Sequence, residues 1–65
     1  MAALSAGQHA RLRRLLDQES AVFEDILLSS VDRFLDWLHD REPELWREVQ
    51  EPVRSAWPSI RETFR

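Results

Sequence analysis

Apolar side chains recur along this chain every three or four residues, which is the period of an amphipathic α-helix. Residues 8–42 contain neither glycine nor proline, and no segment alternates apolar and polar positions as a surface strand does. Strands joined by turns would need glycine or proline more often than this stretch supplies them. The pattern therefore predicts an all-α protein.

Serine residues stand where the first helices are expected to begin. Ser5 and Gln8 have the spacing of a capping box, in which each side chain bonds the backbone N–H of the other residue. Ser20 is expected to cap a second helix, and Ser29 or Ser30 a third. The apolar stripes of these helices are Leu12, Leu15 and Leu16; Val22, Phe23, Ile26 and Leu27; and Val31, Phe34, Leu35 and Leu38.

A long helical hairpin is the alternative, with residues 8–39 as one helix and residues 43–64 as the other. At 100° per residue, the apolar stripe turns by roughly 100° between residues 12–26 and residues 27–38. A heptad seam on a straight helix drifts by only about 20° per heptad, and in the opposite sense. The pattern therefore predicts a break near residues 29–30.

Prolines punctuate the C-terminal third of the chain. Pro43 is expected in the first turn of a fourth helix that runs to about Gln50. Pro52 and Pro58 each mark a new start or a kink. Apolar side chains nevertheless stay within an arc of about 120° through both prolines when the segment is drawn as one helix. This predicts a bent helix, or two nearly collinear ones.

Together these signals predict a compact bundle of four or five short helices in a single small domain over residues 1–65, with the last segment kinked at proline. The predicted core residues are Leu12, Leu16, Phe23, Ile26, Phe34, Leu38, Val49, Trp57 and Ile60. A domain of this length buries only about 60% of its unfolded surface and has little interior from which to form a substrate cleft. We therefore predict no enzyme activity.

The residue types needed for site chemistry are scarce. There is no cysteine, which excludes disulfides, thiolate metal sites and a cysteine nucleophile. His9 and His39 are the only histidines, and they lack the local spacing of metal ligands. We predict no catalytic residue, no metal site and no cofactor. No apolar run has the length of a signal peptide or membrane span, which favours a soluble, cytoplasmic protein.

Charge is distributed unevenly along the chain. The net charge is −3, and every basic residue is an arginine. Residues 1–16 carry a charge of +3, residues 17–51 a charge of −8 and residues 52–65 a charge of +2. Basic ends and an acidic middle favour contacts between unlike surfaces of two molecules.

Two clusters of like charge are candidates for such contacts. The basic cluster is Arg11, Arg13 and Arg14, and the aspartate row is Asp32, Asp36 and Asp40. The aspartates repeat every four residues on one side of a helix, where like charges cost a few tenths of a kcal/mol per pair. A cationic partner would offset this repulsion, while a solvated helix face is the simpler interpretation of the row.

Two large apolar residues are displaced from the stripes of their own helices. Trp37 lies about 100° from the centre of its stripe, with Arg33 one turn earlier, and Leu28 is similarly displaced. Because tryptophan and arginine are enriched at the centres of interfaces, Trp37, Arg33 and Leu28 are candidate interaction residues. The alternative for the two apolar side chains is that they cover a neighbouring helix of the bundle.

The hypothesis that follows is a non-enzymatic protein–protein interaction module, an adaptor or assembly domain that uses charge-segregated helical surfaces. Its partner is expected to be a second copy or a related helical domain, with the basic cluster of one molecule against the aspartate row of the other. Two alternatives remain: a small nucleic-acid-binding regulator that uses the basic cluster, and a non-catalytic accessory subunit of an enzyme complex. The acidic segment disfavours nucleic-acid binding because it repels a polyanion, and no membrane contact is expected. The chain fits either a whole protein or the N-terminal domain of a longer one.

Overall fold

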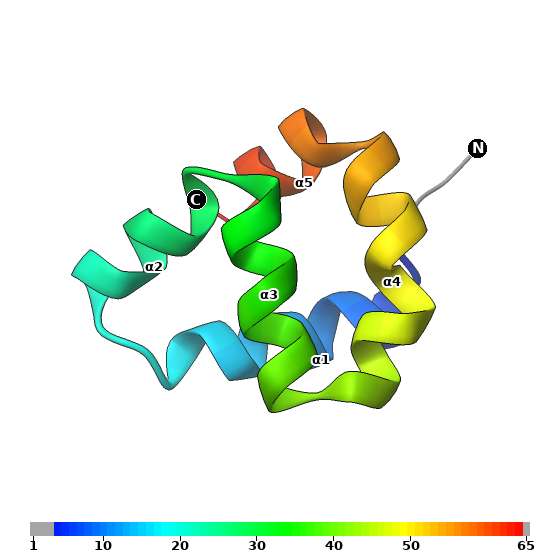
Figure 1. Ribbon diagram of the computed structural model, residues 1–65, viewed down its shortest axis with the longest axis horizontal. Coiled ribbons are helices and arrows are strands. Elements are labelled where there is room, and N and C mark those ends of the chain that lie inside the picture. The colour runs from blue at the N-terminus through cyan, green and yellow to red at the C-terminus, as the bar shows by residue number, and fades with distance from the viewer. Residues whose placement is uncertain (1–3, 65) are drawn as a thin grey trace.

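The computed structural model describes residues 4–64, which form five helices and no strand (Figure 1). The helices are α1 (Ala6–Asp17), α2 (Ala21–Leu28), α3 (Val31–Arg41), α4 (Pro43–Ser55) and α5 (Trp57–Phe64). The predicted all-α bundle of short helices is confirmed. Residues 1–3 and Arg65 lie outside the described residues. Arg65 contributes one of the positive charges that the sequence analysis assigned to the basic C-terminal end.

The first two helices begin at the predicted caps. The backbone N–H of Gln8 donates to the Ser5 hydroxyl at 3.1 Å, and the Ser5 N–H donates to the Gln8 side chain at 3.0 Å. Ser20 Oγ accepts from the N–H of Phe23 at 3.2 Å. Ser30 holds the N-cap position of α3 without a side-chain cap bond. Because the chain leaves the helix at both predicted breaks, the long hairpin is wrong.

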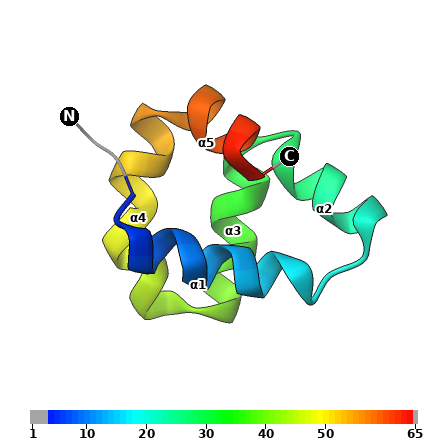
Figure 2. The same ribbon diagram turned by 180° about the vertical axis from the view of Figure 1, so that it is seen from behind.

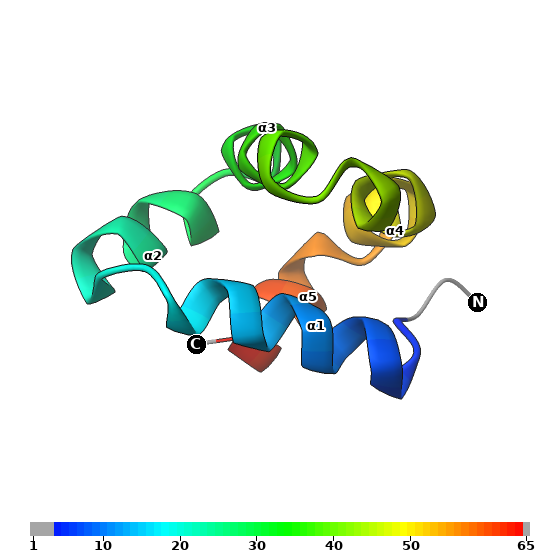
Figure 3. The ribbon, with the colours of Figure 1, turned by 90° about the horizontal axis from the view of Figure 1, so that it is seen from below.

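The C-terminal third breaks at a different place from the predicted one. Helix α4 passes through Pro52 and ends at Ser55, and Ala56 leaves the helical region with φ −119° and ψ 31°. A straight continuation would need an N–H at residue 58 to bond the carbonyl of Arg54, and Pro58 has none. In α5 the same proline lies in the first turn, where its N–H is not needed. Helix α5 therefore turns away from α4, and the two are not collinear (Figure 3).

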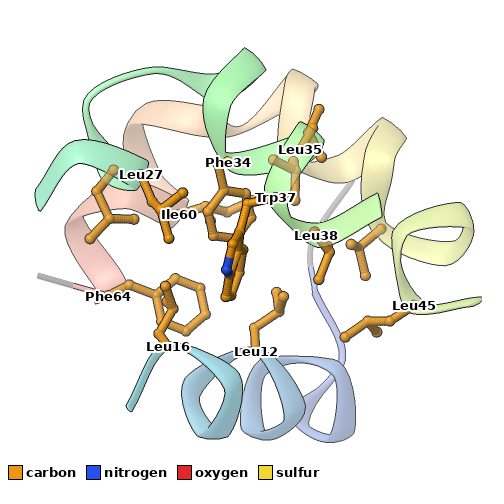
Figure 4. Close-up of a cluster of buried hydrophobic side chains, with 13 residues drawn as sticks. Leu12, Leu16, Leu27, Phe34, Leu35, Trp37, Leu38, Leu45, Ile60 and Phe64 are labelled. Atoms are coloured by element: carbon orange, nitrogen blue, oxygen red, sulfur yellow. The ribbon is translucent and has the colours of Figure 1, made fainter. Parts of the chain in front are cut away.

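The helices form two layers. Helices α3 and α4 run antiparallel side by side in one layer, and α1 runs across both on the other side, next to α5 (Figures 2 and 3). Helix α2 packs against α3 and lies at one end of the long axis of the molecule (Figure 1). The core fills the space between the layers (Figure 4).

Most of the predicted core is buried. The predicted residues that are buried are Leu12, Leu16, Phe34, Leu38, Val49 and Ile60. Phe34 lies at the centre of an aromatic cluster, with its ring centroid 5.7 Å from that of Trp37 and 5.3 Å from that of Trp57. Trp57 is half-buried and packs against the core. Residues missed by the prediction complete the core: Leu27, Leu28, Leu35, Trp37, Leu45, Val53 and Phe64.

Two core predictions are wrong, both on α2. Phe23 and Ile26 are exposed, because α2 turns its Leu27–Leu28 edge to the interior instead. The burial of Trp37 and Leu28 follows from the same packing. Trp37 points from α3 towards α1, between the two layers (Figure 4). The interpretation of Trp37 and Leu28 as surface interaction residues is therefore wrong, and the alternative that they cover neighbouring helices is correct.

Candidate interaction surface

Helix α2 carries large apolar side chains on its outward side. Val22 is 73% exposed, Phe23 37% and Ile26 42%, and among residues 4–64 these are the large hydrophobic side chains with such exposure. Val22 and Ile26 lie on the side of α2 away from Leu27 and Leu28, and Phe23 lies at the edge next to Leu27. We call Val22, Phe23 and Ile26 the α2 face.

The local sequence explains why this surface exists. Five of the eight residues of α2 are large and apolar, so the apolar arc is wider than the side of a short helix that can be buried. Burying the adjacent pair Leu27 and Leu28 turns Val22 and Ile26 to the outside, since they lie about 100–160° away around the helix. A surface helix normally has polar residues on its outward side. Leaving apolar side chains exposed there costs about 25 cal/mol per Å² of apolar area.

The position of α2 leaves this face open. Helix α2 lies between α3 and the C-terminal end of α5, at the end of the molecule away from α4 (Figures 1 and 3). An open depression along one edge of α2 is lined by Ala21, Glu24, Asp25 and Leu28 together with Phe64 of α5. That edge therefore faces α5.

Exposed acidic side chains lie on α2 and on α3. Asp25 is exposed on α2, and Asp36 and Asp40 are exposed on the adjacent helix α3. None of the three forms an ion pair with another residue in the range 4–64. Arg33, also exposed on α3, has no ion pair within this range either and offsets one of these charges.

The basic cluster is largely used within the fold. Arg11 pairs with Glu42 at 2.7 Å, and Arg13 pairs with Asp17 at 2.8 Å and Glu24 at 3.3 Å. The hydrogen bond to Asp17 is the main cause of a raised pKa of the Arg13 guanidinium. These pairs tie α1 to α2 and α4, so the cluster is not a free cationic surface.

Arg13 also holds the end of α5. Its Nη1 donates to the carbonyl of Phe64 at 3.1 Å, and its guanidinium carbon lies 5.9 Å from the centroid of the Phe64 ring. Arg14, the next residue, is exposed and forms no ion pair with residues 4–64. Adjacent arginines therefore have different roles.

We expect Arg13→Ala to lower the free energy of unfolding by about 1–2 kcal/mol, because two partly exposed ion pairs and one charged hydrogen bond are lost together. Arg14→Ala is the matched control, and its effect should stay within about 0.5 kcal/mol. Urea denaturation followed by circular dichroism measures both values. Equal effects of the two substitutions would contradict the role of Arg13 in holding α1, α2 and α5 together.

The remaining predicted site residues are spread over the surface. Asp32 pairs with Arg54 of α4 at 3.4 Å, so the aspartate row is partly compensated at its first member. Asp36, Asp40 and Arg33 stay exposed on α3. The sequence prediction missed the α2 face because it placed Phe23 and Ile26 in the core. The signal that could have identified it is the excess of apolar residues in so short a helix.

The described residues show no arrangement that suggests catalysis or metal binding. No group of three potential ligands among residues 4–64 is placed to hold a metal ion. The His9 ring stacks on Phe64 at 4.7 Å, and the His39 ring meets Trp46 edge-on at 4.5 Å. Both histidines therefore pack against aromatic rings. None of the described helices is long and apolar enough to span a membrane.

Comparison with known proteins adds no further assignment. The chain matches no protein-family model, and no curated protein or solved structure is significantly similar to it.

Proposed function

We propose that this protein is a non-enzymatic interaction module that binds a protein partner through the α2 face. The observation that carries the proposal is the exposure of Val22 and Ile26 on the outward side of a helix whose other edge is fully packed. Single exposed apolar residues are common, but here they are gathered on one short helix. A contiguous apolar patch of this kind is typical of a protein-binding surface.

The proposal changes the surface first expected from the sequence. Charge-driven pairing of the basic cluster with the aspartate row needs free arginines, and Arg11 and Arg13 are paired within the chain. An apolar contact on α2, which also carries the exposed Asp25, supplies burial and orientation together. Apolar area drives association, and the surrounding charges select the partner.

Site-specific crosslinking tests the proposal. A photoreactive phenylalanine analogue at position 22 is expected to give a discrete protein adduct in the cells that naturally produce the chain. The control is the same analogue at position 51, which replaces an exposed residue of α4 at the other end of the molecule. Excess wild-type protein should compete for the adduct, whereas the double variant Val22→Ser with Ile26→Ser should not.

The same double variant separates binding from folding. Since both side chains are exposed, replacing them with serine should change the melting temperature by only a few degrees. An adduct from position 51 alone, or equal competition by the wild type and the double variant, would contradict the proposal.

A further inference from the structure

An open depression lies on the surface of α1, beside the turn that joins α3 to α4 (Figure 2). Its lining residues are Arg11, Arg14 and Leu15 of α1 together with Glu42, the residue between α3 and α4. Its volume is about 200 Å³. We infer that this depression is a binding site separate from the α2 face, and that it takes a small aliphatic carboxylate.

The two arginines offer hydrogen-bond donors to such a ligand. Arg14 is exposed and forms no ion pair with residues 4–64. Arg11 donates from Nη2 to Glu42 Oε1 at 2.7 Å. Because a guanidinium has five N–H groups in a planar arrangement that suits a carboxylate, both arginines have donors left for an acceptor in the depression.

Charge selects the class of anion. Arg11 and Arg14 are three residues apart on α1, where like charges repel each other. Glu42 compensates one of them, so the four lining side chains together carry a charge of +1. A carboxylate has a single negative charge and neutralises this excess. A phosphate group, with a charge close to −2, exceeds it, and Glu42 repels the surplus.

Leu15 adds an apolar surface next to the guanidinium groups. It is half-buried and packs against the core, which fixes its exposed part in place. An alkyl chain attached to the carboxylate can contact this side chain and lose apolar area to water. At about 30 Å³ for each water-sized group, the depression has room for roughly seven non-hydrogen atoms. Pentanoate has this size.

Titration with sodium pentanoate, followed by the amide NMR signals of the isotope-labelled protein, tests the inference. Sodium chloride holds the ionic strength constant. We expect saturable shifts for residues 11–15 and residue 42, with a dissociation constant in the millimolar range because the depression is open to solvent. The alcohol 1-pentanol has the chain without the charge, and inorganic phosphate has charge without the chain. Both should bind several-fold more weakly than pentanoate.

Two variants change the charge of the site in opposite directions. Arg14→Gln removes the unpaired cation and should weaken pentanoate binding roughly tenfold. Glu42→Gln removes the competing carboxylate and should strengthen binding several-fold, since it releases Arg11. The Glu42 side chain makes no cap bond to α4, so this change leaves the start of the helix intact. The matched control is Arg47→Gln, at an exposed arginine of α4 without an ion pair in the range 4–64, and it should leave binding unchanged.

Several results would overturn the inference. Shifts that never saturate, or equal binding by the wild type and Arg14→Gln, would show that the depression is not a carboxylate site. Binding of 1-pentanol as tight as that of pentanoate would show an apolar contact alone, and tighter binding of phosphate would show a site for dianions. Weaker binding by Glu42→Gln would contradict the charge argument. The double variant Val22→Ser with Ile26→Ser should bind pentanoate as the wild type does, so this site and the α2 face are tested independently.

Discussion

Replacing Phe34 by alanine is expected to leave the protein largely unfolded at room temperature. The Phe34 side chain is fully buried, and its ring contacts those of Trp37 and Trp57 from α3 and α5. Truncation of a buried phenylalanine costs about 3–5 kcal/mol, from lost transfer energy and from the cavity that remains. The single core of a chain of 65 residues rarely supplies a stability of more than about 3–5 kcal/mol, so this loss removes most or all of it.

Circular dichroism with urea denaturation measures this effect. The matched control is Glu51→Ala on the exposed side of α4, which should stay within about 0.5 kcal/mol of the wild type. Retention of a cooperative melt within a few degrees of the wild-type temperature by Phe34→Ala would show that α3 does not form the centre of the core.

The helix limits could be predicted because they depend on neighbouring residues alone. The capping box at Ser5 and the cap at Ser20 are local hydrogen bonds, and they appear where the sequence placed them. The end of α4 was placed too early because a helix tolerates Pro52 when packing supports it. Only Pro58 stops it, through the backbone bond that proline cannot make.

The buried side of each helix could be predicted only where the apolar stripe is narrow. Helix α1 has such a stripe, and Leu12 and Leu16 are buried as expected. Helix α2 is apolar over more than half of its circumference, so the sequence allows several orientations. Its packing against α3 selects the one that buries Leu27 and exposes Ile26.

Charge shows the same division between local and tertiary information. The sequence locates the basic and acidic segments, yet not their pairing. Arg11 forms its ion pair with Glu42, and Arg13 its pair with Glu24, only when α1 crosses the bundle. Residues far apart in sequence thereby neutralise most of the basic cluster. The candidate surface therefore lies on α2 and not on the arginines.

Trp37→Ala is expected to destabilise the protein about as much as Phe34→Ala. Trp37 is only 8% exposed. Helix α3 is covered by α2, α4 and α1, so the buried part of its circumference is wider than its apolar stripe indicates. Truncating a buried tryptophan costs about 3–5 kcal/mol. Ile26→Ala, at a residue first assigned to the core, should cost less than about 1 kcal/mol because the side chain is already 42% exposed.

A second substitution distinguishes loss of packing from loss of the indole itself. Trp37 Nε1 is buried and has no hydrogen-bond partner among residues 4–64. Trp37→Phe removes this unpaired N–H, whose burial costs about 1–3 kcal/mol, and this gain should offset much of the lost ring volume. We therefore expect Trp37→Phe to stay within about 1.5 kcal/mol of the wild type while Trp37→Ala unfolds. The opposite result would be a wild-type urea midpoint for Trp37→Ala and a lowered midpoint for Ile26→Ala. It would show that Trp37 is exposed and Ile26 buried, so that the α2 face is part of the core.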